Sequence, residues 1–91
     1  MKPELTMTPR LAAGVRLNER TQDPRLLLMP ERALRLNGPS LEIIQLCDGK
    51  HTVLEISQKL QQLYGKAEPQ RILDDLLGYL SLLHDQRAID F

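Results

Sequence analysis

The 91-residue chain contains 42% hydrophobic and 26% charged residues, which fits one small folded domain. Twelve Lys and Arg residues balance twelve Asp and Glu residues, and this neutrality argues against a dedicated nucleic-acid binder, which is usually strongly basic. The single cysteine, Cys47, excludes an intramolecular disulfide framework and a cysteine-rich zinc site. No apolar run approaches the ~20 residues of a membrane helix, and the start lacks the apolar core of a signal peptide. We therefore expect a soluble cytoplasmic protein.

The first third of the chain reads as an arm followed by three strands. Residues 1–9 hold two prolines and little apolar content, and we expect a flexible or extended arm there, before a single domain over residues 10–91. Apolar and polar residues alternate over residues 15–19 and 32–37, the period of a half-buried strand. Residues 25–29 form a further apolar run that Pro30 closes. Three short strands in sequence predict an antiparallel meander.

The hydrophobic period then changes to that of helices. Pro39 is placed to start a short helix that ends before Gly49, which suits a left-handed position. Thr52 and Glu55 have the spacing of a capping box and predict a second helix. Pro69 opens the last helix, which we expect to end around residues 84–85, leaving residues 88–91 as a tail. Strands followed by helices predict an α+β domain.

The residues that carry chemistry do not form a catalytic or metal-binding set. His51 and His84 are far apart in sequence and have no companion ligand at helical spacing. Cys47 lies in the apolar stripe of the first helix, and we expect a buried structural thiol. Asp74 and Asp75 are adjacent on a helix and point about 100° apart, so they do not converge on one substrate atom. We therefore predict a protein that is not an enzyme and that needs no metal or cofactor.

Two binding functions remain, and one of them is DNA recognition. Strands with three helices can form a winged-helix regulator whose last helix enters the major groove. Here that helix would carry Asp74, Asp75 and Asp85 against only Arg71 and Arg87. Because phosphate contacts supply much of the affinity for DNA, an acidic reading helix argues against this alternative.

Recognition of a peptide or protein suits the pattern better. A short meander leaves an open strand edge, to which an extended peptide can add through main-chain hydrogen bonds. In the third strand we expect Leu34 and Leu36 to pack inward, which leaves Ala33 and Arg35 on the outer face. The last helix holds more leucine than one face can bury, and an open edge with surplus leucine also allows a homodimer.

The order and spacing of several short motifs resemble the PqqD family over residues 10–91. The second strand and the corner after it contribute Leu-Leu-Met-Pro-Glu at residues 27–31, and the end of the third strand contributes Leu-Asn at residues 36–37. The helical part contributes Cys-Asp-Gly at residues 47–49, Thr-Val at residues 52–53 with Ile56, and Asp-Leu-Leu-Gly-Tyr-Leu at residues 75–80. Pro39, Asp-Pro at residues 23–24 and Arg-Ala-Ile at residues 87–89 depart from the family pattern, which leaves open another peptide-modification pathway.

The resemblance implies a winged-helix-like RiPP recognition element, with a three-stranded antiparallel sheet followed by three helices. It implies a peptide chaperone that binds the ribosomally made precursor peptide PqqA in pyrroloquinoline quinone biosynthesis. The chaperone would present this peptide to the radical SAM enzyme PqqE, which cross-links a Glu and a Tyr of the peptide. By position, the peptide would add beside the third strand in a groove against the last helix. The implied peptide-binding residues are Arg32, Ala33, Leu34, Arg35, Leu36, Asn37, Ile72, Asp75, Leu76, Tyr79 and Leu83.

Overall fold

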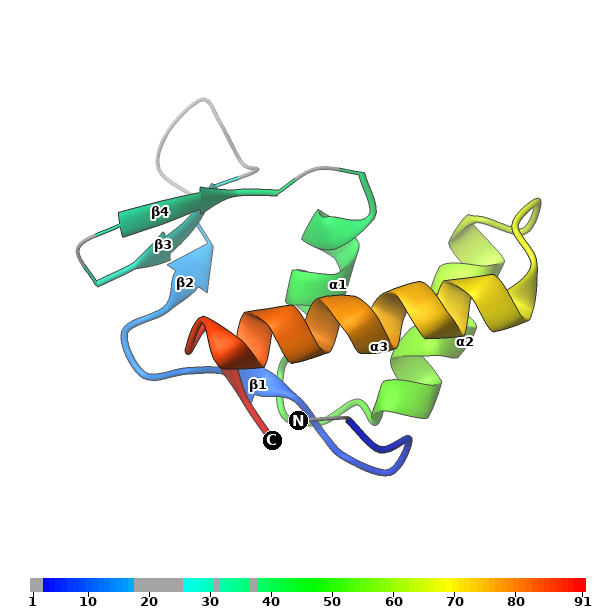
Figure 1. Ribbon diagram of the computed structural model, residues 1–91, viewed down its shortest axis with the longest axis horizontal. Coiled ribbons are helices and arrows are strands. Elements are labelled where there is room, and N and C mark those ends of the chain that lie inside the picture. The colour runs from blue at the N-terminus through cyan, green and yellow to red at the C-terminus, as the bar shows by residue number, and fades with distance from the viewer. Residues whose placement is uncertain (1–2, 18–25, 31, 37) are drawn as a thin grey trace.

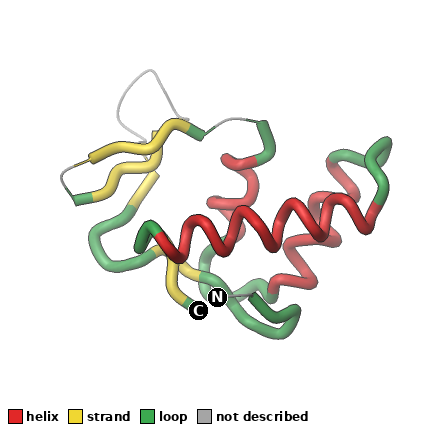
Figure 2. The backbone as a smooth tube through the Cα atoms, viewed as in Figure 1, coloured by secondary structure: helices red, strands yellow, loops and turns green. Residues whose placement is uncertain are grey.

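The computed structural model describes residues 3–17, 26–30, 32–36 and 38–91 (Figure 1). Over these residues, a three-stranded antiparallel sheet precedes three helices, which confirms the expected α+β fold. Figure 2 shows the sheet at one end of the molecule and the helices packed together beside and below it. The sheet has the order β2 (Arg16–Leu17), β3 (Leu26–Met29) and β4 (Arg32–Arg35), and the helices are α1 (Ser40–Leu46), α2 (Val53–Leu63) and α3 (Pro69–Asp85).

The register of β3 and β4 decides which side chains face the core. Leu27 pairs with Leu34, and Leu27 is fully buried while Leu34 packs against the core. Leu36, just after β4, is fully buried as well. Ala33 and Arg35 are exposed, so the predicted inward and outward faces of this strand are confirmed. The Asp-Pro pair at residues 23–24 lies outside the described residues.

A second, two-stranded sheet was not expected from the sequence. We expected residues 88–91 to form a tail, and this expectation is corrected here. β1 (Arg10–Leu11) pairs antiparallel with β5 (Ile89–Asp90), and the Ala12 amide donates to the Ala88 carbonyl at 3.0 Å. Two-residue strands are too short to show a period of two, so only the tertiary structure could reveal them.

The segment before β1 packs on the start of α2. We expected a flexible or extended arm at residues 1–9. Residues 3–9 form no helix or strand, but the amides of Val53 and Leu54 donate to the Met7 and Leu5 carbonyls at 2.8 and 3.1 Å. These bonds satisfy amides of the first turn of α2 that have no partner within the helix. Pro9 is buried, and its carbonyl accepts from the Gly49 amide at 2.9 Å.

The helix ends largely follow the sequence signals. The Glu55 amide donates to the Thr52 hydroxyl at 3.1 Å, and the Thr52 amide donates to the Glu55 carboxylate at 2.9 Å, which confirms the capping box. Gly49 is left-handed at φ +77°, as expected. Pro69 opens α3. Pro39 differs slightly from its expected place, because it is the cap of α1 rather than its first helical residue.

The core lies between the three helices and the inner face of the sheet. α1 supplies Ile44, α2 supplies Ile56 and α3 supplies Leu80, all nearly or fully buried. Cys47 joins them at 3% exposure, and burial, with a smaller contribution from neighbouring Asp48, raises the pKa of its thiol to about 12. Cys47 is therefore a buried, protonated thiol, as the sequence predicted. Among the described helices, none combines the length and apolar character needed to cross a membrane.

Candidate functional site

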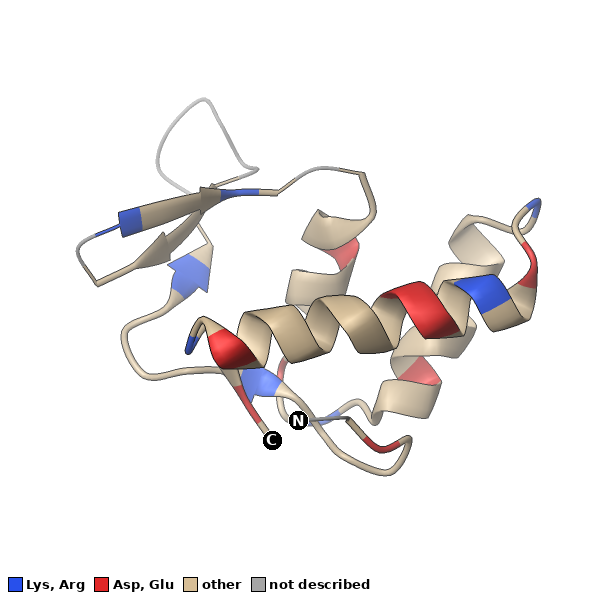
Figure 3. Ribbon diagram, in the orientation of Figure 1, with Lys and Arg blue, Asp and Glu red and all other residues tan. Residues whose placement is uncertain are grey.

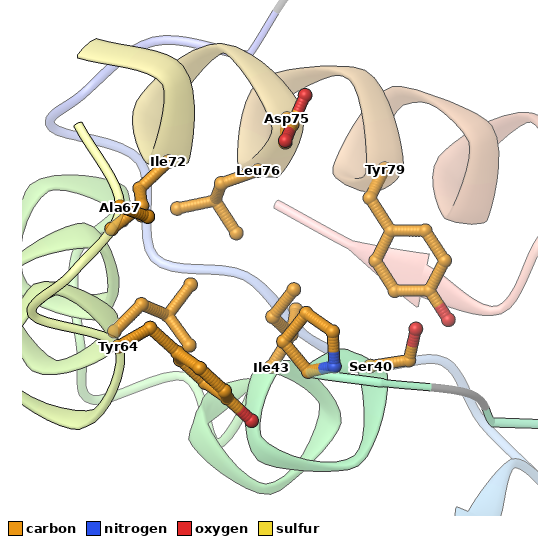
Figure 4. Close-up of a pocket in the computed structure, with 10 residues that line it drawn as sticks. Ser40, Ile43, Tyr64, Ala67, Ile72, Asp75, Leu76 and Tyr79 are labelled. Atoms are coloured by element: carbon orange, nitrogen blue, oxygen red, sulfur yellow. The ribbon is translucent and has the colours of Figure 1, made fainter. Parts of the chain in front are cut away.

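A largely apolar pocket of about 360 Å³ lies where the start of α1, the end of α2 and the first half of α3 meet (Figure 4). Its volume is in the lower range for sites that take a small ligand or a single large side chain. Three helices are needed to form it, because each contributes only one wall. The lining residues are Pro39, Ser40, Ile43, Leu60, Tyr64, Ala67, Ile72, Asp75, Leu76 and Tyr79.

The α3 wall of the pocket comes from one helical stripe. Ile72, Leu76 and Tyr79 are spaced i, i+4 and i+7 and project from α3 toward the cavity in Figure 4. In the same view the Tyr79 hydroxyl points toward the Ser40 side chain at the start of α1. Leu76 is 1% exposed and forms the floor, while Ile72 and Tyr79 are half-buried. This wall can accept apolar groups while keeping one hydroxyl near water.

Asp75 carries the charge among the residues that line this pocket. Its carboxylate lies 3.9 Å from the Arg71 guanidinium one helical turn earlier, and the two side chains are 77% and 79% exposed. An ion pair this exposed is worth little, because water and salt screen it. Asp75 can therefore exchange Arg71 for a cation on a ligand at the rim.

The sequence predicted part of this site and missed part of it. Of the five α3 residues we assigned to peptide binding, Ile72, Asp75, Leu76 and Tyr79 line the pocket. Leu83 continues the same stripe but is fully buried in the core, so this structure does not place it at the surface. The sequence reasoning missed the walls from α1 and α2, namely Pro39, Ser40, Ile43, Leu60, Tyr64 and Ala67. The feature of the sequence that could have pointed to these residues is their place in the chain, because several of them stand at helix ends.

β4 lies at the edge of the sheet, paired with β3 and with no other described strand. None of the described strand residues that we predicted, residues 32–36, lines the pocket. Instead, Arg32 at the start of β4 donates from its Nη2 to the Gln86 carbonyl at 2.7 Å, beyond the end of α3. The chain then leaves β4 through buried Leu36 and reaches the pocket at Pro39. Asn37, the last predicted strand residue of the site, lies outside the described residues.

A second depression, of about 510 Å³, opens beside the Arg32 contact. Val15, Met29 and Pro30 supply apolar parts of its wall, and Arg32 and Arg87 are the charged residues among the described ones that line it. Arg87 has a left-handed backbone at φ +61°, which is uncommon for a residue with a side chain. The two depressions thus border opposite ends of α3. The remaining lining residues are Ala12, Ala13 and Gln86.

Asp48 and His84, two titratable groups away from these depressions, have local partners. Asp48 accepts the amides of Lys50 and His51 at 2.8 and 3.2 Å, and its carboxylate lies 3.0 Å from His51 Nδ1. These hydrogen bonds, led by the Lys50 amide, lower the pKa of Asp48 to about 2. The His84 ring packs against Phe91 with 5.4 Å between centroids. Within the described residues, no group of three or more His, Cys, Asp or Glu side chains could hold a metal ion.

Sequence comparison matches residues 25–89 to the family described as coenzyme PQQ synthesis protein D, PqqD. A PqqA binding protein of Pseudomonas aeruginosa is 35% identical over 89 residues, which cover 97% of this chain and 95% of the relative. A PqqA binding protein of Rahnella aquatilis is 33% identical over 92% of this chain and 87% of its own length. A bifunctional coenzyme PQQ synthesis protein C/D of Methylorubrum extorquens is 37% identical over 90% of this chain, which spans 22% of that longer protein.

A solved structure shares the fold. The solution NMR structure of the PqqD truncation of Methylobacterium extorquens PqqCD superposes with a TM-score of 0.73 at 37% sequence identity. The match covers 91% of this chain and 88% of that one. That structure is described as a functional, stand-alone recognition element for ribosomally synthesised and post-translationally modified peptides.

Proposed function

Because the chain belongs to the PqqD family, we propose that it is a non-catalytic peptide chaperone that binds the precursor peptide PqqA. The observation that carries this proposal is that the edge strand β4 leads along the chain to the apolar pocket at the start of α1. β4 offers main-chain groups along the edge of the sheet, and the chain beyond it reaches the pocket at Pro39. Relatives that cover nearly the whole chain are named for PqqA binding, which supports the choice of peptide.

The proposed binding mode adds the peptide as a strand beside β4. Main-chain hydrogen bonds would supply affinity with little dependence on sequence, and pockets for side chains would supply specificity. Ala33 and Arg35 lie on the outer face of β4, while Leu34 and Leu36 stabilise the strand from below. One large apolar side chain of the peptide would enter the pocket formed by Ile72, Leu76 and Tyr79. The finer site is therefore β4 with the first half of α3, without Leu83.

The partner enzyme and the location in the cell complete the proposal. The chaperone would hand PqqA to the radical SAM enzyme PqqE in the cytoplasm. This handover needs no catalytic group on the chaperone itself. The Methylorubrum extorquens relative is bifunctional and longer, so a module of this kind can also form part of a larger PQQ synthesis protein.

Backbone amide chemical-shift mapping during a PqqA titration tests the binding mode. We expect the largest shifts at residues 32–35 of β4 and at Ile72 and Tyr79 on α3. Shifts confined to α1 and α2, with residues 32–35 silent, would contradict the strand-addition mode. No shift anywhere at saturating peptide would contradict PqqA binding itself. Adding PqqE to the peptide complex then tests for a three-component assembly.

DNA recognition was the alternative from the sequence. Asp74 and Asp75 are exposed on α3, where a reading helix would need cations. The family match and the relatives named for peptide binding favour the peptide chaperone over a DNA-binding regulator.

Self-association is the last part of the proposal. The open edge of β4 can pair with a second copy when no peptide is bound, and the segment at residues 3–9 can exchange between copies because backbone hydrogen bonds hold it. Light scattering after size-exclusion chromatography should show a dimer that PqqA shifts toward monomer. A monomer at every protein concentration would contradict it.

A further inference from the structure

The two depressions beside α3 carry opposite charges. We call the pocket with Asp75 at its rim the acidic pole, and the depression with Arg32 and Arg87 the basic pole. Figure 3 shows acidic residues on the first half of α3, and basic residues at the start of β4 and just after the end of α3. Asp85 is exposed near the basic pole but does not line it. Among the described residues that line them, each pole therefore presents one sign of charge beside apolar walls, while Arg71 lies 3.9 Å from Asp75 outside the lining of the acidic pole.

The distance between the poles corresponds to a short stretch of extended chain. Asp75 and Gln86 are separated by about eleven residues of helix, which at ~1.5 Å per residue is about 16 Å. An extended peptide advances ~3.3 Å per residue and would cover this distance in about five residues. β4 connects the same two places, since it begins at Arg32 and the chain beyond it arrives at Pro39 and Ser40.

From this juxtaposition we propose that the two poles fix the direction and register of a bound peptide. The ligand is an extended peptide with an acidic residue against Arg32 and Arg87 and a basic residue against Asp75, about five residues apart. A large apolar side chain next to the basic residue fills the pocket. This inference rests on the proposed peptide-binding function and specifies the class of sequence that the site takes.

The local contacts prepare both poles for this role. Arg32 is fixed by its 2.7 Å bond to the Gln86 carbonyl, which holds its guanidinium beside the second depression. The Arg87 amide donates to the His84 carbonyl at 3.0 Å, and this bond fixes the position of the Arg87 backbone. At the other pole, the ion-pair partner of Asp75 within the described residues is the exposed Arg71, 3.9 Å away, and a ligand cation can replace it. A peptide in the reverse orientation would place like charges together, which disfavours it.

Charge reversal at each pole, paired with charge reversal in the ligand, tests the inference. The variants are Arg87→Glu and Asp75→Lys, and the probe is synthetic PqqA measured by calorimetry at low and physiological ionic strength. Each variant should weaken binding about three- to tenfold, and more at low ionic strength. In a peptide series, replacing one acidic residue with lysine should restore binding to Arg87→Glu alone. Replacing one basic residue with glutamate should restore binding to Asp75→Lys alone.

Matched controls separate these effects from folding and from bulk charge. Asp74→Lys changes the neighbouring carboxylate, which points about 100° away on the same helix. Lys59→Glu reverses an exposed charge on α2 that lines neither pole. Both controls should bind PqqA as the native protein does, and all variants should keep the native circular dichroism spectrum and melting temperature within a few degrees.

The outcomes distinguish this inference from the function on which it rests. If the native protein does not bind PqqA, the proposed function fails, and the inference fails with it. If PqqA binds but the pole variants bind as tightly as the controls, the inference alone is wrong. The inference would also be overturned if replacing one peptide residue, or two adjacent ones, restored binding to both variants. The two poles require peptide residues about five positions apart.

Discussion

The Arg32 guanidinium and the Gln86 carbonyl are 54 positions apart in the sequence, yet they form a hydrogen bond of 2.7 Å. This bond ties the start of β4 to the end of α3. It closes one end of the region between the edge strand and the last helix, while the apolar pocket lies at the other end. The proposed site is therefore defined at both ends by contacts between distant parts of the chain.

Replacing Arg32 with alanine should weaken this tie. The bond is exposed, so we expect the free energy of unfolding to fall by on the order of 0.5–1 kcal/mol. Urea unfolding followed by circular dichroism measures the change. Arg16→Ala, which removes an exposed arginine from β2 in the same sheet, is the matched control. Equal losses in the two variants would show that the Gln86 contact adds nothing beyond an ordinary surface arginine.

Tyr79 offers the cleanest test of the pocket. Leu76 is 1% exposed, so its truncation would damage the core as well as the site, whereas Tyr79 is half-buried. Tyr79→Ala should weaken PqqA binding by about 1–3 kcal/mol, because it removes one wall of the pocket. Tyr79→Phe should keep most of the affinity. Leu82→Ala is the control, since Leu82 is 49% exposed on the same helix and does not line the pocket. An equal effect of Leu82→Ala would argue against the pocket.

Cys47 should react slowly with thiol reagents in the native protein. Its side chain is 3% exposed and the pKa of its thiol is raised to about 12, so thiolate is scarce at neutral pH. Labelling should accelerate strongly in urea and follow unfolding. Rapid labelling of the native protein, at the rate seen in urea, would contradict the buried assignment.

The same thiol makes stability depend on alkaline pH. Its pKa rises from 9.0 in the unfolded chain to about 12 in the native protein, so the native state binds the proton more tightly. The contribution to stability is complete below pH 9 and is lost as the pH rises toward 12. The melting temperature of the native protein should therefore fall more steeply above pH 9 than that of Cys47→Ala. Parallel curves would show that the thiol does not contribute.

The capping box of α2 should contribute measurably to folding. Thr52→Ala removes the hydroxyl that accepts the Glu55 amide at 3.1 Å. We expect a loss of about 1 kcal/mol and a melting temperature lower by about 4–8 °C. Thr52→Ser keeps the acceptor and serves as the control. If Thr52→Ser loses as much as Thr52→Ala, the hydroxyl is not the stabilising group.

The sequence alone determined the features that depend on local spacing. Alternation at residues 32–37 placed Leu36 in the core and Arg35 on the outer face, because a strand has a side-chain period of two. The box at Thr52 and Glu55 fixed where α2 begins, and Pro69 fixed where α3 begins. The α3 residues that the family resemblance implied, Ile72, Leu76 and Tyr79, form one helical stripe and line the pocket.

Tertiary structure alone decided the features that depend on distant segments. The pairing of Leu11 with Ile89 left no pattern in the sequence, because two residues cannot show a period. The α1 and α2 walls of the pocket, such as Ser40 and Tyr64, depend on how three helices pack. Leu83 shows the same limit from the other side. Its spacing places Leu83 on the same helical stripe as Ile72, Leu76 and Tyr79, but α3 packs so that Leu83 is completely buried. Helical periodicity indicates the face on which a residue lies and not how deeply that face is buried.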